Sequence, residues 1–170
     1  MNKVAAGKEK AIAYLDTPIG RIGVAEDGVG ISDLFFVQPG NGAGKKRTTL
    51  PDGEVRETPL LREAAVQLGE YFEGKRKVFD LPLSFGGTSF QKDDWNALLT
   101  IPYGETRSYK QIAEQIGRPK AYRAVGMANN RNPISILIPC HRVIGHDGAL
   151  VGYGSGLPHK AYLLNLEKGE

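Results

Sequence analysis

Residues 108–142, SYKQIAEQIGRPKAYRAVGMANNRNPISILIPCHR, decide the fold of the second half of the chain. Ser108 and Gln111 stand at the spacing of a capping box, in which each side chain binds the other residue's backbone N–H. Three apolar residues then follow at helical spacing: Ile112, Ala113 and Ile116. Gly117 ends this pattern, since glycine readily adopts the left-handed conformation that closes a helix. The sequence therefore predicts a short helix between Ser108 and Gly117.

A second short helix is expected after Pro119. Its apolar side is a narrow stripe at positions i, i+3, i+4 and i+7, formed by Ala121, Ala124, Val125 and Ala128. On a different face, Arg123 points outward and Gly126 leaves room for a close backbone approach. Two short helices joined by a tight turn fit a DNA-reading helix-turn-helix, and they also fit a plain helical hairpin. The pattern alone leaves both interpretations open.

The apolar run Ile134–Ile138 predicts a strand that is buried on both faces and delivers Cys140 at its end. His141 and Arg142 follow, and positive neighbours favour a thiolate over a thiol. Adjacent residues of a strand point to opposite faces, so Cys140 and His141 interact directly only if the backbone turns there, with the help of Asn132. A lone cysteine in this setting is either a reactive nucleophile or a small buried apolar residue.

A glycine-rich segment, LVGYGSGL at residues 150–157, follows a predicted turn at residues 146–148. Its three glycines surround Tyr153 and Ser155. A backbone of this kind can approach a ligand closely and direct N–H groups at an oxygen. A flexible linker has the same composition, so this segment is a weak signal by itself.

The last predicted helix begins near Pro158. Helical spacing places four of its residues on one side: Lys160, Leu163, Leu164 and Glu167. A carboxylate on this partly apolar side needs a partner because a buried unpaired charge is costly, and His141 is the candidate. Alternatively, Glu167 belongs to a frayed terminus.

The first half of the chain has the pattern of a small α/β domain. Residues 11–37 alternate short apolar stretches with the turn signals TPIG and EDG, which predicts an antiparallel meander of three strands. Residues 38–53 show no periodicity and predict an exposed loop. A helix capped by Thr58, with Pro59 at its first position, is expected to run to Gly74 and to pack on the meander.

An extended crossing segment, residues 77–89, connects the two halves. We place the domain boundary near Gly86, which divides the chain into residues 1–85 and 86–170. The second part begins with a helix at Ser89. The apolar residues expected on the buried side of this helix are Phe90, Trp95, Leu98 and Leu99.

Composition excludes several classes of protein. The 170 residues are 41% hydrophobic and 24% charged, which is typical of globular proteins. No apolar run approaches the roughly 20 residues that cross a bilayer, and the start lacks the apolar core of a secretory signal. We therefore expect a cytoplasmic protein with no membrane partner. One cysteine excludes an internal disulfide and, with only three histidines, argues against a dedicated zinc site.

The net charge of +3 conceals a local basic excess. Between Glu105 and Arg142 only Glu105 and Glu114 are acidic, and the basic residues outnumber them by five. The basic residues are Arg107, Lys110, Arg118, Lys120, Arg123, Arg131 and Arg142. Such a distribution fits a polyanion partner, and it fits a solvated surface equally well.

Four segments, taken together, resemble one protein family. They are FEGKRKVFDLPL at residues 72–83, GTSFQKDDWNALLTIPYGETRSYKQIA at 87–113, RAVGMANNRNPISILIPCHRVIG at 123–145 and GYGSGL at 152–157. In this order and spacing they are similar to the O6-alkylguanine-DNA alkyltransferases, also called methylated-DNA–protein-cysteine methyltransferases. The resemblance covers nearly the whole chain and is strongest from Gly87 onward.

This resemblance implies an α/β N-terminal domain of ribonuclease-H-like fold, followed by a mainly α C-terminal domain with a winged helix-turn-helix. It also implies DNA repair by direct reversal. After the damaged nucleotide is flipped, an alkyl group moves irreversibly from O6 of guanine, or O4 of thymine, to Cys140. No cofactor and no metal are expected. The implied partner is double-stranded DNA with an alkylated base, bound by a monomer or cooperatively by several copies.

The resemblance also assigns the chemistry to single residues. Cys140 is the alkyl acceptor, and His141 is the water-linked base that helps to form its thiolate. Glu167 orients this relay, and Asn132 buttresses the active-site turn.

Further residues are implied in binding DNA and the damaged base. Arg123 fills the vacated place in the base stack, and Tyr109 drives rotation of the nucleotide. Lys160 supports hydrogen bonding near O6 of guanine. The guanine pocket is lined by the carbonyls of Cys140 and Val143 and by Tyr153, Gly154 and Ser155.

Three departures from the family pattern stand out. Asp94 precedes Trp95 where the family usually has an apolar residue, which puts the local packing in doubt. Gly154 occupies a position where some members carry serine, and the zinc ligands of some relatives are absent. Three rival interpretations are a lesion-binding protein that lacks the acceptor cysteine, a winged-helix regulator with a structural cysteine, and a Cys/His hydrolase. The presence of Cys140 argues against the first, and no triad pattern supports the last.

Overall fold

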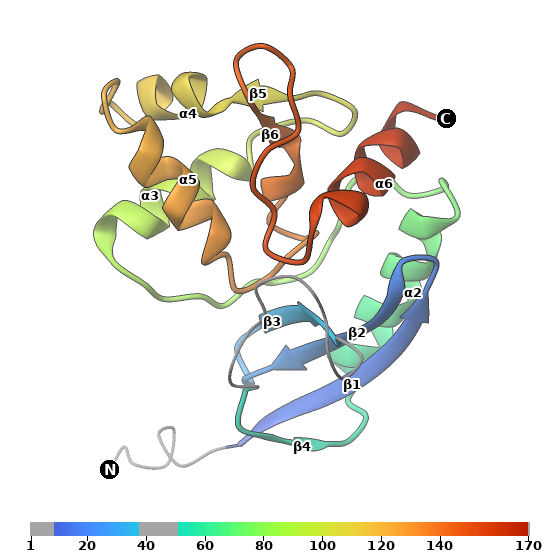
Figure 1. The fold of residues 1–170 in the computed structure, drawn as a ribbon. Coiled ribbons are helices and arrows are strands. Elements are labelled where there is room, and N and C mark those ends of the chain that lie inside the picture. The colour runs from blue at the N-terminus through green and yellow to red at the C-terminus, as the bar shows by residue number, and fades with distance from the viewer. Residues whose placement is uncertain (1–8, 38–50, 170) are drawn as a thin grey trace.

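A four-stranded sheet forms the lower part of the molecule in the computed structural model, which describes residues 9–37 and 51–169 (Figure 1). Three of its strands are β1 (Lys10–Thr17), β2 (Gly20–Glu26) and β3 (Ile31–Phe36). Both pairings are antiparallel, with Ala13 opposite Val24 and Val24 opposite Leu34. The meander predicted for residues 11–37 is therefore confirmed.

A fourth strand, β4 (Gly53–Val55), was not predicted. It pairs in parallel with β1, so the order in the sheet is β3-β2-β1-β4. All three of its residues are exposed, and a strand this short carries no alternating pattern. Of the loop predicted over residues 38–53, residues 38–50 lie outside the described residues.

Helix α2 (Pro59–Phe72) packs against β1 and β2, as predicted. Thr58 caps it by accepting a hydrogen bond from the Leu61 backbone N–H at 3.0 Å, and Pro59 occupies the first turn. The helix buries Leu61, Ala64, Gln67, Leu68 and Tyr71. After it, Gly74 adopts a φ of +77°, the left-handed conformation that favours glycine.

The outer edge of β3 is covered by two other segments of the chain. Near its start, the Ile31 N–H donates to the Pro82 carbonyl at 2.8 Å, and Ser84 N–H donates back to Ile31 at 2.8 Å. Near its end, the Leu34 N–H donates to the Pro133 carbonyl at 2.9 Å. The crossing segment and the segment that leads to Cys140 are thus both attached to the sheet.

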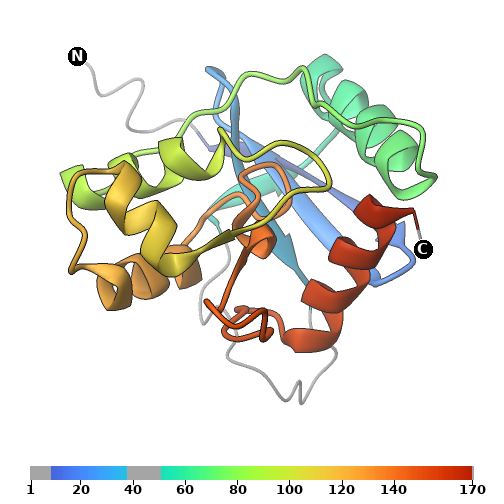
Figure 2. The same cartoon turned by 90° about the horizontal axis from the view of Figure 1, so that it is seen from above.

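The rest of the chain is mainly helical, with α3, α4 and α5 on one side and α6 on the other (Figures 1 and 2). The bounds are α3 (Ser89–Leu98), α4 (Tyr109–Gln115), α5 (Tyr122–Asn130) and α6 (Leu157–Lys168). A two-stranded parallel pair, β5 (Arg107–Ser108) and β6 (Val143–Ile144), joins the segment before α4 to the segment after Cys140. The expected capping box of Ser108 and Gln111 is present, and Thr88 and Gln91 form a second one.

Two details of the predicted helix faces are wrong. Leu99 is 40% exposed, because α3 ends at Leu98; Trp95 and Leu98 are buried as expected, and Asp94 and Ala97 are buried beside them. In α5 the buried side consists of Val125, Ala128 and Asn129, and Ala124 is exposed. The inner face of α5 is rotated toward Asn129 because that side chain has a buried partner on α3.

The strand predicted at Ile134–Ile138 is wrong, although the apolar side chains are buried as expected. Ile136 has a φ of +72°, which breaks the extended conformation, and the Leu137 N–H donates to the Ser135 carbonyl at 2.8 Å. The segment is therefore a compact turn. It leads into the 3₁₀ helix η1 (Cys140–Arg142).

Most buried apolar side chains of both halves belong to one continuous core. This cluster includes Ile22 and Leu34 from the sheet, Leu68 from α2, Trp95 from α3 and Leu163 from α6. Within residues 9–37 and 51–169, the helices are too short or too polar to cross a membrane.

Candidate active site

Asn132 fixes the backbone turn that carries Cys140. Its side-chain Nδ2 donates to the Ile138 carbonyl at 2.8 Å and to Cys140 Sγ at 3.2 Å. Its Oδ1 accepts from the Ile134 N–H at 2.9 Å. One side chain thus ties both ends of the apolar turn to the sulfur, which explains how a left-handed Ile136 is kept in place.

Cys140 is a buried thiol, 7% exposed. Burial raises its pKa to about 11, against the hydrogen bond from Asn132 and the positive charge of Lys160, which lower it. The expectation that His141 and Arg142 provide the positive surroundings is wrong, because the Arg142 guanidinium is bound to Glu167 and burial lowers the pKa of His141. The resting thiol is therefore protonated at neutral pH.

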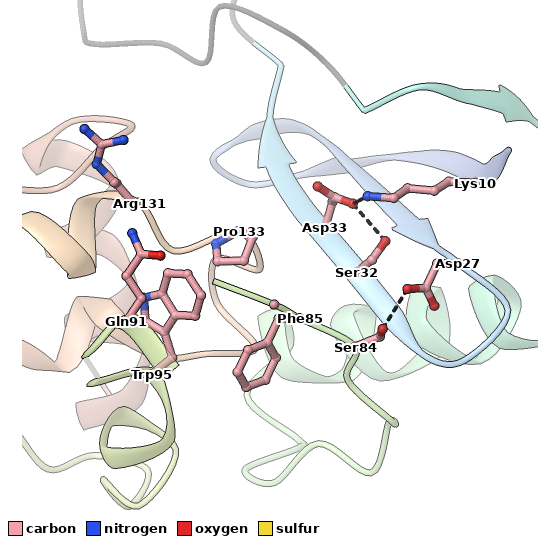
Figure 3. A pocket seen from close by; sticks show the side chains of 11 residues that line it. Lys10, Asp27, Ser32, Asp33, Ser84, Phe85, Gln91, Trp95, Arg131 and Pro133 are labelled. Carbon is pink, nitrogen blue, oxygen red and sulfur yellow. Dashed lines mark hydrogen bonds and ion pairs between the residues drawn. The ribbon is translucent and has the colours of Figure 1, made fainter. Parts of the chain in front are cut away.

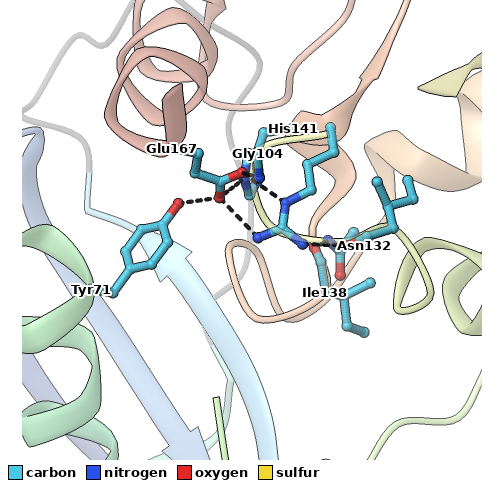
Figure 4. A network of polar contacts seen from close by, with 8 residues as sticks. Tyr71, Gly104, Asn132, Ile138, His141 and Glu167 are labelled. Carbon is cyan, nitrogen blue, oxygen red and sulfur yellow. Dashed lines mark hydrogen bonds and ion pairs between the residues drawn. The ribbon is translucent and has the colours of Figure 1, made fainter. Parts of the chain in front are cut away.

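Glu167 is the centre of a buried polar network (Figure 4). Its Oε2 accepts from His141 Nε2 at 2.7 Å and from the Tyr71 hydroxyl at 2.6 Å. Arg142 binds both carboxylate oxygens, Nε to Oε1 at 2.8 Å and Nη2 to Oε2 at 3.0 Å. The predicted contact between His141 and Glu167 is confirmed. Tyr71 and Arg142 were not predicted as its partners.

The donors around Glu167 determine the protonation of the network. Burial alone would raise the pKa of Glu167, but hydrogen bonds from His141 and Arg142 hold it well below its usual range. Burial lowers the pKa of His141, so the ring is neutral at neutral pH. Since the ionised carboxylate only accepts, His141 carries its proton on Nε2. Its Nδ1 is then a free acceptor, and it is buried with no partner among the described residues.

Lys160 and Tyr109 meet at the glycine-rich segment. Lys160 is fully buried, and its Nζ donates to the carbonyls of Val151 at 2.6 Å and Gly152 at 3.3 Å. The Tyr109 hydroxyl donates to the same Val151 carbonyl at 2.9 Å. Burial lowers the pKa of Lys160 to about 8 and raises that of Tyr109 to about 12. Two residues with predicted binding roles are thus brought together.

Tyr153 and Ser155 link the glycine-rich segment to the N-terminal sheet. The Tyr153 hydroxyl is buried without a hydrogen-bond partner among the described residues, and its ring meets Phe36 edge-on. Ser155 Oγ lies 2.8 Å from His159 Nδ1, and His159 stacks on Phe36 at a centroid distance of 4.7 Å. Gly154 lies between them, and its absent side chain would have open space apart from the Asn130 carbonyl.

Arg123 is exposed on α5, as predicted. Helix α5 packs against α4, and at Gly126 a side chain would lie 3.8 Å from the Tyr109 ring. The basic surface is smaller than the sequence count suggests, because Arg142 is buried with Glu167.

Asp94 is a second buried carboxyl near the site. It is fully buried on α3, and the Asn129 amide, oriented with its nitrogen toward Asp94, donates to Oδ2 at 2.6 Å. Burial raises the pKa of Asp94 to about 7. Its negative charge in turn raises the pKa of both Cys140 and Tyr109. The departure from the family pattern at this position is thus accommodated by a polar partner.

A cavity of about 470 Å³ lies between the meander and α3, away from Cys140 (Figure 3). Two pairs among its polar walls are Lys10 with Asp33 at 2.7 Å and Ser84 with Asp27 at 2.6 Å. Within the described part of the chain, no three His, Cys, Asp or Glu side chains cluster as metal ligands.

Two family models match the chain. Residues 11–85 match the 6-O-methylguanine DNA methyltransferase, ribonuclease-like domain, and residues 89–169 match the 6-O-methylguanine DNA methyltransferase, DNA binding domain. The two matches adjoin at the crossing segment.

Individual relatives agree with this assignment. The chain is 54% identical to a methylated-DNA–protein-cysteine methyltransferase of Methanosarcina barkeri, over 91% of this chain and 94% of the relative. It is 52% identical to the constitutive methylated-DNA–protein-cysteine methyltransferase of Bacillus subtilis, over 90% and 92%. Its fold matches the crystal structure of Mycobacterium tuberculosis OGT in complex with DNA, with a TM-score of 0.80, 46% identity and coverage of 94% and 93%. The chain therefore belongs to the 6-O-methylguanine DNA methyltransferase family.

Proposed function

We propose that this protein repairs alkylated DNA by moving an alkyl group from O6 of guanine, and from O4 of thymine, onto Cys140. The observation that carries the proposal is the acceptor thiol, bound by Asn132 and followed directly by His141 of the buried Glu167 network. A fixed sulfur beside a neutral, buried imidazole is suited to nucleophilic attack.

The reaction begins with loss of the thiol proton. We assign this proton to His141 Nδ1 by way of a water molecule, since Nδ1 is a buried acceptor without a partner among the described residues. The imidazolium that results is stabilised by the carboxylate of Glu167 at 2.7 Å. Asn132 stabilises the developing thiolate through its hydrogen bond to Sγ.

The sulfur then attacks the alkyl carbon. An S–C bond forms, the C–O6 bond breaks, and its electron pair moves to the guanine, which takes up a proton. Lys160 lies at the glycine-rich segment and is the group that we assign to hydrogen bonding near O6 of the leaving base. The product is a thioether, which water and cellular thiols do not reverse. Each molecule therefore acts once.

Recognition of the DNA is assigned to α4 and α5, which we interpret as the helix-turn-helix of a winged domain, with β5 and β6 next to it. Arg123 projects from the exposed side of α5 and would fill the place of the flipped nucleotide. Tyr109 would drive the rotation, since it lies between α5 and the glycine-rich segment.

The flipped guanine would bind in a pocket made from the segments around Cys140. We assign its lining to the carbonyls of Cys140 and Val143 and to Tyr153, Gly154 and Ser155. The unpartnered hydroxyl of Tyr153 is available to such a ligand. Anchoring of Ser155 through His159 and Phe36 would keep this wall in position.

We also propose the finer architecture: a ribonuclease-H-like N-terminal domain over residues 1–85 and a DNA-binding, alkyl-accepting domain over residues 86–170. The protein would bind DNA as a monomer or cooperatively along one duplex. Continuity of the apolar core across both parts supports a rigid arrangement of the two domains.

The test is the intact mass and peptide map after mixing with duplex DNA that contains O6-methylguanine. We expect a gain of one methyl group on Cys140 with the damaged duplex and none with undamaged duplex. Cys140→Ser should bind the damaged duplex without gaining mass. A regulator with a structural cysteine would show neither mass gain nor preference for the lesion, and transfer by Cys140→Ser would refute the mechanism.

A further inference from the structure

Tyr71 is a residue of the ribonuclease-like segment that reaches the Glu167 network. It lies near the end of α2 and is fully buried. Its hydroxyl donates to Glu167 Oε2 at 2.6 Å, across 96 residues of sequence (Figure 4). The contact joins the two segments that match different family models.

The direction of this hydroxyl is fixed by the packing of the ring. Tyr71 lies 5.4 Å from the Phe72 ring, 5.3 Å from Phe79 and 6.2 Å from Tyr103, measured between centroids. A ring enclosed in this way cannot swing its oxygen toward another acceptor without repacking the cluster. The hydrogen bond to Glu167 is therefore part of the rigid structure.

Tyr71 and His141 donate to the same oxygen of Glu167. A hydrogen bond to a carboxylate stabilises its charged form and lowers its affinity for a proton. Tyr71 therefore limits how strongly Glu167 raises the pKa of His141, and it fixes the oxygen to which the imidazole is bound. Burial and the charge of Glu167 raise the pKa of Tyr71 itself, so its hydroxyl remains a donor.

We propose that Tyr71 is a positioning residue for alkyl transfer, through which the ribonuclease-like domain orients the Glu167 carboxylate and its bound imidazole. The inference rests on the proposed function and extends it to the N-terminal domain. Tyr71 acts only through Glu167 and His141, so it sets the basicity and orientation of the relay.

The test compares Tyr71→Phe with Tyr103→Phe. The first removes only the hydroxyl that binds Glu167, and the second removes a hydroxyl from the same aromatic cluster. The single-turnover rate of methyl transfer from an O6-methylguanine duplex is measured against pH, together with thermal stability. For Tyr71→Phe we expect the plateau rate to fall about ten- to a hundredfold, as for one lost hydrogen bond to a charged group. The acid limb should move to higher pH, since Glu167 then raises the pKa of His141 further. Tyr103→Phe should keep the original profile.

An unchanged plateau and acid limb in folded Tyr71→Phe would overturn the proposal, even with lower thermal stability, because the tyrosine would then be structural only. If Tyr71→Phe does not fold, 3-fluorotyrosine at position 71 replaces it. This side chain keeps the ring and donates a stronger hydrogen bond, so the acid limb should move to lower pH. An acid limb that stays at the original pH would contradict the proposal.

Nitrogen NMR of the His141 ring separates this inference from the proposed function. It reports the pKa and tautomer of the imidazole without any transfer reaction, and Tyr71→Phe should raise that pKa. If the unsubstituted chain gains no methyl group, the proposed function fails, and the NMR shift still decides the role of Tyr71. If the chain is methylated and neither rate nor shift responds to the substitution, the role of Tyr71 alone is refuted.

Discussion

Glu167 and Asp94 are both buried carboxyls in the C-terminal half, and their environments push them to opposite protonation states. Glu167 is 6% exposed and accepts from His141, Arg142 and Tyr71, so its pKa is well below its usual range. Asp94 is 0% exposed, and burial raises its pKa to about 7; its partner is the neutral amide of Asn129. The two carboxyls are buried to a similar depth, but the groups that donate hydrogen bonds to them differ.

The difference shows that the charge of a buried carboxyl is determined by its donors rather than by its burial. A bidentate guanidinium and three further donors, from His141, Tyr71 and the Gly104 backbone, compensate the loss of water around Glu167. One neutral amide does not compensate it around Asp94. The relay residue is thereby kept ionised, and the carboxyl between α3 and α5 changes its charge near neutral pH.

The largest expected effect comes from removing the cation beside Glu167. Arg142→Met keeps the volume but leaves a buried carboxylate with fewer donors, so we expect the free energy of unfolding to fall by about 3 to 5 kcal/mol. Urea denaturation measures it. Arg107→Met, which breaks the partly exposed pair with Glu105, is the matched control and should cost less than about 1 kcal/mol. Equal losses would mean that Glu167 does not depend on Arg142.

The next effect is the pH dependence of stability at Asp94. Its pKa is about 7 in the folded chain against 3.8 in the reference state, so between these values the folded protein binds the proton more tightly. Stability should therefore fall as pH rises through this window, by as much as about 4 kcal/mol. Asp94→Asn should abolish this fall, and urea denaturation between about pH 4 and 8 measures it. Exposed Asp93→Asn is the control.

Glu167 contributes the opposite slope at lower pH. Its folded pKa is depressed below 4.5, so its stabilisation is present above that value and is lost as the pH falls. A variant Asp94→Asn that still loses stability between pH 4 and 7, in parallel with Asp93→Asn, would contradict the assignment of the slope to Asp94.

The smallest expected effect is on the thiol. The rate at which iodoacetamide alkylates Cys140, measured by mass spectrometry, should rise with pH. The midpoint of this rise should lie at about pH 11, because burial disfavours the thiolate. The charge of Asp94 raises the pKa of Cys140, so Asp94→Asn should move the midpoint slightly to lower pH. Asp93→Asn should leave it in place. A shift to higher pH would show that Asp94 does not act on Cys140 through its charge.

Features with local signals were predictable from the sequence. The caps at Thr58 and Ser108 and the three-strand meander depend on neighbouring residues, and the structure confirms them. The buried side of α6 followed from helical spacing, which also indicated the contact between Glu167 and His141. The family resemblance then assigned the reaction and its residues.

Features that depend on distant partners were not predictable. The apolar run at Ile134–Ile138 gives no sign of the left-handed Ile136, because hydrophobicity does not distinguish a buried strand from a buried turn. Arg142 was counted with the basic surface, since its partner is 25 residues away. The bond from Tyr71 to Glu167 has no signal in the sequence, because the two residues are 96 positions apart.

The covered edge of β3 has a consequence for the protein in concentrated solution. An open edge strand offers unpaired N–H and C=O groups to other molecules and promotes aggregation. Here the Ile31 and Leu34 backbone groups are occupied by Pro82, Ser84, Pro133 and Ser135 of the same chain. The segment that carries the acceptor cysteine thus also shields the sheet from intermolecular pairing, so any change that frees it endangers colloidal stability as well as repair.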